Sequence, residues 1–234
     1  VEKTLEIGGK LVYVNSVHAI PEKPNREVIT EVDSYNPSNV EGEYAKSKAE
    51  AARFVLEAVA NHGLDACIVQ PSGIIGPYDF KTTHLTQLVI DAVTGRLKAG
   101  VKGGYDFVDV RDVVNGIIAA CDRGQPGESY ILSGHYISVP ELFQMIAEAS
   151  GQKPIKTFLP LWLAKLTAPL SELYYNLRHQ PPLYTKYSLY TLTSNSNFSH
   201  AKADRELGYH SRPPQETITD TVRWLKPRLH PPRP

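Results

Sequence analysis

Apolar and polar positions along the chain follow two different periods. Short apolar runs typical of buried strands occupy residues 11–16, 66–71, 105–110 and 128–134. Segments with apolar residues at every third or fourth position, typical of helices, occupy residues 41–62, 85–95, 111–124 and 138–151. Strand and helix therefore alternate, and this order predicts an α/β fold with a mainly parallel sheet covered by helices.

The pattern changes beyond residue 152. A segment rich in proline and tyrosine comes first, and two short helices are predicted over 198–209 and 214–225. The chain ends on KPRLHPPRP, whose prolines predict a loose tail. At the other end, VEKTLEIGG predicts a helix that is stopped by glycine.

Charge and composition indicate no large partner. The chain has 25 Lys and Arg against 25 Asp and Glu, without a long run of either sign, so its charge indicates neither a nucleic-acid partner nor an acidic membrane surface. No N-terminal signal is present, and no stretch approaches the roughly 20 apolar residues that a membrane span needs. The densest apolar segment, 158–170, is interpreted as the wall of a pocket. The alternative is that this segment lies on a membrane surface.

The two cysteines, Cys67 and Cys121, lie within apolar runs. In such runs a buried reduced thiol is favoured over a disulfide or a metal ligand. This cysteine usage predicts a cytoplasmic protein. No cluster of His, Cys and carboxylate residues has the spacing of a metal site, so no metal is predicted.

The helix expected at 41–62 carries Tyr44 and Lys48 four residues apart. Positions i and i+4 share a helix face, whereas Lys46 points elsewhere. A nearby ammonium favours the phenolate form of a tyrosine, whose free pKa is about 10, and so equips the pair for proton exchange with a substrate hydroxyl. The alternative is a solvated polar face, because a Tyr-x-x-x-Lys match is expected about once by chance in such a chain.

Upstream of this helix, the apolar run KLVYVNSVHA places Ser16 at the carboxyl end of a strand. This is the edge where α/β proteins bind ligands. A serine hydroxyl there can hold a substrate oxygen on which charge develops. The alternative is that Ser16 begins a turn or caps a backbone group.

Taken together, Ser16, then Tyr44 and Lys48, then VQPSGIIGPYD after the next strand, resemble the extended short-chain dehydrogenase/reductase family. The resemblance covers nearly all of the chain, since YDFVDVRDV, SYILSG and RELGY also look like the family's second half. It implies NAD or NADP as cofactor and Ser16, Tyr44 and Lys48 as the catalytic triad. It also implies that Tyr44 and Lys48 contact the cofactor and that Pro71, Ser72 and Gly73 lie along the nicotinamide.

Further residues are candidates for the substrate pocket or for structural roles. Four of them could line a substrate pocket or could equally be core or surface residues: His18, Tyr78, His84 and Tyr105. Asp109 and Asp112 stand at a strand-to-helix junction and are interpreted as helix-start carboxylates rather than catalytic acids. The resemblance also implies a homodimer that pairs partly through the helix at 41–62.

The sequence departs from the family in one respect. Neither EIGGK nor KAGVKGGY has the spacing of the phosphate-binding glycine loop. We therefore expect a partial Rossmann-like, doubly wound parallel sheet without its first βαβ units, over residues 1–151, and a small mainly helical substrate lobe with closing helices over 152–234. A fragment of a longer enzyme is favoured over a natural short form, and the choice between NAD and NADP is left open.

The predicted function is that of an NAD(P)-dependent oxidoreductase acting on a carbonyl or alcohol of a small molecule. IVQPSGIIGP looks more like the segment in dihydroflavonol reductases and 3β-hydroxysteroid dehydrogenases than that in nucleotide-sugar epimerases. Together with the apolar lobe, this favours a hydrophobic substrate. The alternatives are a nucleotide-sugar epimerase or dehydratase, and a non-catalytic binding protein.

Overall fold

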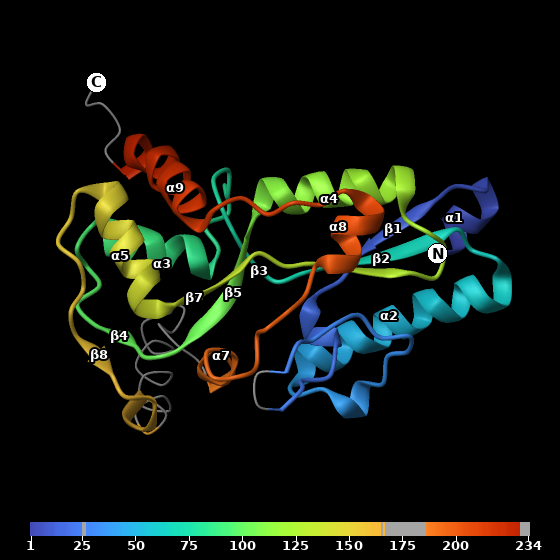
Figure 1. Ribbon diagram of the computed structural model, residues 1–234, viewed down its shortest axis with the longest axis horizontal. Coiled ribbons are helices and arrows are strands. Elements are labelled where there is room, and N and C mark those ends of the chain that lie inside the picture. The colour runs from blue at the N-terminus through green and yellow to red at the C-terminus, as the bar shows by residue number, and fades with distance from the viewer. Residues whose placement is uncertain (25–26, 165, 167–185, 230–234) are drawn as a thin grey trace. The chain divides into compact units, whose positions relative to one another are not determined.

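The computed structural model describes residues 1–24, 27–164, 166 and 186–229 (Figure 1). The chain divides into two compact units, each built from three segments. Unit 1 contains residues 1–74, 106–135 and 195–214, and unit 2 contains residues 75–105, 136–194 and 215–234. The sequence predicts a cofactor-binding domain over residues 1–151 and a substrate lobe over 152–234, and this assignment of binding roles stays a prediction.

Three parallel strands form a sheet in unit 1. In spatial order they are β1 (Leu11–Val14), β2 (Ala66–Pro71) and β6 (Ser129–Leu132). Leu11 lies opposite Ala66, and Ile68 lies opposite Ser129. Every residue of β2 and β6 is buried, which explains why both strands read as continuous apolar runs.

Helices cover both faces of this sheet (Figure 1). On one face lies α2 (Glu43–His62), and on the other lie α4 (Val110–Arg123) and α8 (Ala201–Leu207). Alternate residues of β2 belong to different cores: Ala66 and Ile68 pack with α2, whereas Cys67 and Val69 pack with α4. The predicted α/β fold with a parallel sheet between helices is confirmed.

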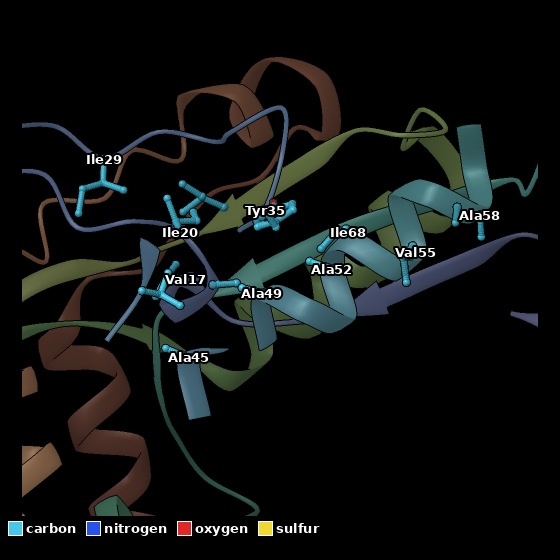
Figure 2. Close-up of a cluster of buried hydrophobic side chains, with 14 of the residues drawn as sticks. Val17, Ile20, Ile29, Tyr35, Ala45, Ala49, Ala52, Val55, Ala58 and Ile68 are labelled. Atoms are coloured by element: carbon cyan, nitrogen blue, oxygen red, sulfur yellow. The ribbon is translucent and has the colours of Figure 1, made fainter. Parts of the chain in front are cut away.

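Helix α2 packs on the sheet through a row of small side chains (Figure 2). Its buried residues are Ala45, Ala49, Ala52, Val55 and Ala58. They recur at intervals of three or four and so share one face of the helix. Because most of them are alanines, little side-chain volume separates this face of the helix from the strands.

Short elements complete unit 1. They are α1 (Glu2–Ile7) and the 3₁₀ turns η1 (Val17–Ala19) and η2 (Pro37–Asn39). Gly8 ends α1 with φ 63°, a left-handed conformation that glycine adopts without strain, as the sequence predicts.

A second three-stranded sheet has the order β3 (Gly73–Ile75), β5 (Gly104–Asp109) and β7 (His135–Ser138). The boundary between the two units crosses all three strands. Only β5 corresponds to a strand expected from the sequence. The strands β3 and β7 are not expected from the sequence, because GII lies in a proline- and glycine-rich segment that reads as a loop and HYIS runs directly into the helix predicted at 138–151.

Unit 2 contains the remaining elements. The strands β4 (Gly100–Val101) and β8 (Phe158–Leu159) pair in parallel, and the helices are α3 (His84–Val93), α5 (Val139–Ser150), α7 (Lys186–Thr191) and α9 (Pro214–Leu229). Ser138 caps α5 in a capping box with Glu141.

Two expectations concern the C-terminal half. The loose tail expected from Lys226 is wrong in its first part, because α9 continues to Leu229 with Pro227 inside its last turns. A proline removes only one hydrogen-bond donor, and Arg228 stabilises this end by donating to the Trp224 carbonyl at 2.8 Å. Within the apolar segment at 158–170, residues 165 and 167–170 lie outside the described residues, and its interpretation as the wall of a pocket stays a prediction. Every described helix is too short or too polar to cross a bilayer.

Candidate active site

Ser16 lies just beyond the carboxyl end of β1 and is buried. It caps η1: its Oγ accepts a hydrogen bond from the backbone N–H of His18 at 3.3 Å. Ser16 is therefore a capping residue, as the alternative interpretation predicts, and its catalytic role stays a prediction. A hydroxyl that accepts a hydrogen bond keeps its own proton to donate, so the cap orients Oγ and leaves it able to act on a ligand.

Tyr44 and Lys48 lie on the same face of α2. The Lys48 Nζ is 5.8 Å from the centroid of the Tyr44 ring. Tyr44 is 48% exposed, and Lys48 is half-buried. Lys46 instead pairs with Glu43 at 3.0 Å on the exposed side of the helix. The geometry expected from the spacing of the three residues is thus present.

His18 connects the turn after Ser16 with α2. Its ring stands edge-on to that of Tyr44, with 5.8 Å between centroids and an interplanar angle of 77°. Burial lowers the pKa of His18 below its ordinary value, so its imidazole is neutral near pH 7. A substrate role for His18 stays a prediction, but the structure places it against a residue of the expected triad.

Pro71, Ser72 and Gly73 occupy the carboxyl end of β2 and the start of β3. The Ser72 N–H donates to the Leu132 carbonyl at 3.3 Å, which ties this turn to β6. Since β1 and β2 are adjacent and parallel, Ser16 and these three residues leave the sheet at the same edge. Contact with a nicotinamide stays a prediction.

The other candidate substrate residues belong to unit 2, whereas the expected triad belongs to unit 1. Tyr78 is 60% exposed and lies edge-on to Trp224, with 6.2 Å between ring centroids. His84 is exposed at the start of α3, and Tyr105 is buried in β5. Their contact with a substrate stays a prediction.

The carboxylates at the start of α4 are structural, as predicted. Asp109 caps the helix by accepting from the Arg111 N–H at 2.8 Å. Asp112 pairs with Arg212 at 2.7 Å and also accepts from the Arg212 backbone N–H at 2.8 Å. Hydrogen bonding to Asp112 raises the pKa of the Arg212 guanidinium, which keeps this guanidinium charged.

Three buried polar residues escape the sequence analysis: Asn15, which directly precedes Ser16, Gln70, which donates to the Ser16 carbonyl, and Tyr35, which contacts Gln70. Asn15 and Gln70 each lie near the end of an apolar run, where a polar residue is normally taken to mark the end of the strand. They could have been noticed because each is a primary amide within or directly beside a strand that is otherwise apolar.

These features define a Rossmann-like α/β protein with a Ser, Tyr and Lys constellation beside the carboxyl edge of its sheet. The family model "NAD dependent epimerase/dehydratase family" matches residues 2–133. The chain belongs to this family, and the resemblance to extended short-chain dehydrogenases/reductases is confirmed at this level.

Individual relatives agree with this assignment. "Sterol demethylase protein B" of Methylococcus capsulatus is 30% identical in a match that covers 94% of this chain and 67% of that protein. "Putative dihydroflavonol 4-reductase" of Synechocystis is 28% identical over 93% of this chain and 64% of that protein. The crystal structure of gox2253 is 34% identical, with a TM-score of 0.80 over 96% of this chain and 68% of that one. The chain thus spans about two thirds of the length of these relatives.

Proposed function

We propose that this chain is part of an NAD(P)-dependent oxidoreductase that interconverts a carbonyl and an alcohol on a small hydrophobic molecule. The observation that supports it best is the placement of Tyr44 and Lys48 on one face of α2, with the His18 ring joining Tyr44 to the turn that holds Ser16. The names of two relatives, a sterol demethylase protein and a dihydroflavonol 4-reductase, support a hydrophobic substrate.

The residues fit the nicotinamide end of such a cofactor. Lys48 is half-buried and has no carboxylate partner among the described residues, and its ammonium, 5.8 Å from the centroid of the Tyr44 ring, is available to ribose hydroxyls. Pro71 presents no N–H and Gly73 no side chain, so a flat ring can lie close to this turn. The sequence offers no glycine loop for the diphosphate, and the proposal concerns the nicotinamide end alone. When bound, the nicotinamide would give or take the hydride.

Each residue of the triad then has a distinct task. The Ser16 hydroxyl donates a hydrogen bond to the substrate oxygen, while its own oxygen is held by the His18 N–H. Tyr44 gives a proton to that oxygen during reduction or removes one during oxidation. The Lys48 ammonium stabilises the negative charge left on the tyrosine oxygen.

The test compares Tyr44→Phe and Lys48→Ala with Lys46→Ala in the full-length protein. Lys46 is the matched control because it lies on the same helix but pairs with Glu43 on the exposed face. Oxidation of NADH and NADPH is followed with a panel of hydrophobic ketones. We expect Tyr44→Phe and Lys48→Ala to lower kcat by at least about a hundredfold, a loss typical of removing general acid–base catalysis, and Lys46→Ala to leave it near the parent value. Unchanged activity in Tyr44→Phe would refute the proposal and favour a non-catalytic binding protein.

A second candidate function is a nucleotide-sugar epimerase or dehydratase, which the description of the matched family supports. The same three residues would serve it. Offering the protein a UDP-sugar beside the ketone panel separates the two functions, and turnover of the sugar alone would select the second. Titration of NADH and NADPH, followed by their fluorescence, identifies the preferred cofactor.

A further inference from the structure

Two primary amides are buried beside Ser16. Asn15, directly after β1, is 5% exposed, and Gln70, in β2, is 0% exposed. Burying such a group is costly unless its hydrogen bonds are replaced. An apolar residue at either position would fit the runs LVYV and ACIV that precede them. The hydrogen bonds of these amides therefore indicate what they do.

Asn15 connects the strand that precedes Ser16 with the backbone of Lys48. Its Nδ2 donates to the Lys48 carbonyl oxygen at 3.2 Å. A carbonyl can only accept, so this contact also fixes which way the amide points. The backbone N–H of Asn15 donates to the Val69 carbonyl at 2.8 Å, which keeps the residue in the sheet. Asn15 is thus bonded to β2 and to α2 at the same time.

The Oδ1 atom of Asn15 has no hydrogen-bond partner among the described residues, although it is buried. The amide therefore gains one hydrogen bond and leaves one acceptor unsatisfied, which makes it a poor stabiliser of the fold. An apolar side chain at this position could not form the hydrogen bond with the Lys48 carbonyl.

Gln70 holds Ser16 from the other side. Its Nε2 donates to the Ser16 carbonyl oxygen at 3.5 Å, and its Oε1 accepts from the Tyr35 hydroxyl at 3.0 Å. The Tyr35 hydroxyl also lies 2.8 Å from Ser129 Oγ. Because the Ser16 carbonyl can only accept, the amide nitrogen of Gln70 must face it, which fixes the direction of the amide. Tyr35 then gives its single proton to Gln70 Oε1.

We propose that Asn15 and Gln70 are positioning residues, which hold Ser16 between β2 and the second turn of α2 and so fix its place relative to Tyr44 and Lys48. This inference rests on the proposed function. The two amides touch only backbone carbonyls of the triad, one of Lys48 and one of Ser16, and leave all three reactive side-chain groups free for substrate and cofactor. Displacing a catalytic group by about 1 Å can lower the rate by about a hundredfold, so loss of these contacts is expected to lower turnover.

The test uses Asn15→Leu and Gln70→Met in the full-length protein, since both replacements keep approximate size and remove the amide. Ser133→Ala is the control: Ser133 is equally buried in unit 1, but its hydroxyl contacts the Phe198 carbonyl and His200. We expect each amide variant to lower kcat at least about tenfold, with KM and the Kd for the reduced cofactor within about threefold of the parent. The control is expected to keep the parent kcat.

A purely structural role predicts the reverse, a lower unfolding midpoint with kcat per folded molecule unchanged, and that result would overturn the inference. If Gln70→Met does not fold, Tyr35→Phe tests the same contact by removing the donor to Gln70 Oε1, and an unchanged kcat in Tyr35→Phe would likewise overturn it. Tyr44→Phe is measured in parallel. Full activity in Tyr44→Phe would reject the proposed function and this inference together, whereas inactive Tyr44→Phe beside fully active amide variants would reject this inference alone.

Discussion

Replacing Tyr35 by phenylalanine is expected to change stability in a way that depends on pH. Tyr35 is 3% exposed, and its hydroxyl lies between Gln70 Oε1 and Ser129 Oγ. Removing the hydroxyl leaves the Gln70 acceptor buried without this donor, which costs about 1–3 kcal/mol. At neutral pH we therefore expect Tyr35→Phe to lower the free energy of unfolding by this amount.

At alkaline pH the difference between the two proteins is expected to shrink. Burial is the main cause that raises the pKa of Tyr35 from 10.0 to about 12. The folded state thus keeps a proton that the unfolded state releases, and this raised pKa corresponds to about 2–3 kcal/mol of stability. That stability is complete below about pH 10 and is lost as the pH rises toward about 12. The phenylalanine variant has no such proton to lose.

The assay is urea unfolding of the parent and of Tyr35→Phe at several pH values between about 7 and 11.5. Tyr136→Phe is the control, because its phenol is 60% exposed and its loss should change little at any pH. A difference between parent and Tyr35→Phe that is equally large at pH 7 and at pH 11.5 would refute the reasoning. It would show that the hydroxyl is hydrated or that its hydrogen bonds do not persist in the folded protein.

Two further predictions concern packing and a buried ion pair in unit 1. Ala52→Leu, on the face of α2 that packs on the sheet, is expected to lower the free energy of unfolding by about 1–3 kcal/mol, measured by urea titration, because a fully buried alanine leaves no room for three more carbons. Arg212→Ala is expected to cost about 3–5 kcal/mol in the same assay, since it leaves the buried Asp112 carboxylate without the guanidinium that balances its charge. Arg223→Ala, which breaks an exposed pair with Asp220, should cost under about 1 kcal/mol.

The sequence predicts the features that depend on local periodicity. The shared face of Tyr44 and Lys48 follows from helical spacing alone, and so does the divergence of Lys46. The parallel sheet of unit 1 follows from the order of apolar runs, because β2 and β6 are buried on both faces. Asp109 is recognisable as a helix cap because it directly precedes α4.

The features that escape prediction depend on contacts between distant segments. The hydrogen bond between Asn15 and the Lys48 carbonyl joins residues 33 positions apart, and that between Tyr35 and Ser129 joins residues 94 positions apart. A polar residue near the end of an apolar run gives no sign of its partner. The division of the chain is equally hidden, because each unit is assembled from three separate segments.

Ser16 shows why a capping role and a catalytic role need not compete. From the sequence the two roles are alternatives, since the one hydroxyl of Ser16 would either cap a turn or bind a substrate oxygen. In the structure the hydroxyl accepts a hydrogen bond from the His18 N–H, and this uses a lone pair rather than the proton. Under the proposed function the same N–H restricts the rotation of Oγ, so the cap orients the donor that the substrate oxygen requires. The turn that follows β1 is then part of the catalytic arrangement, because its backbone and the Gln70 amide together hold both the side chain and the carbonyl of Ser16.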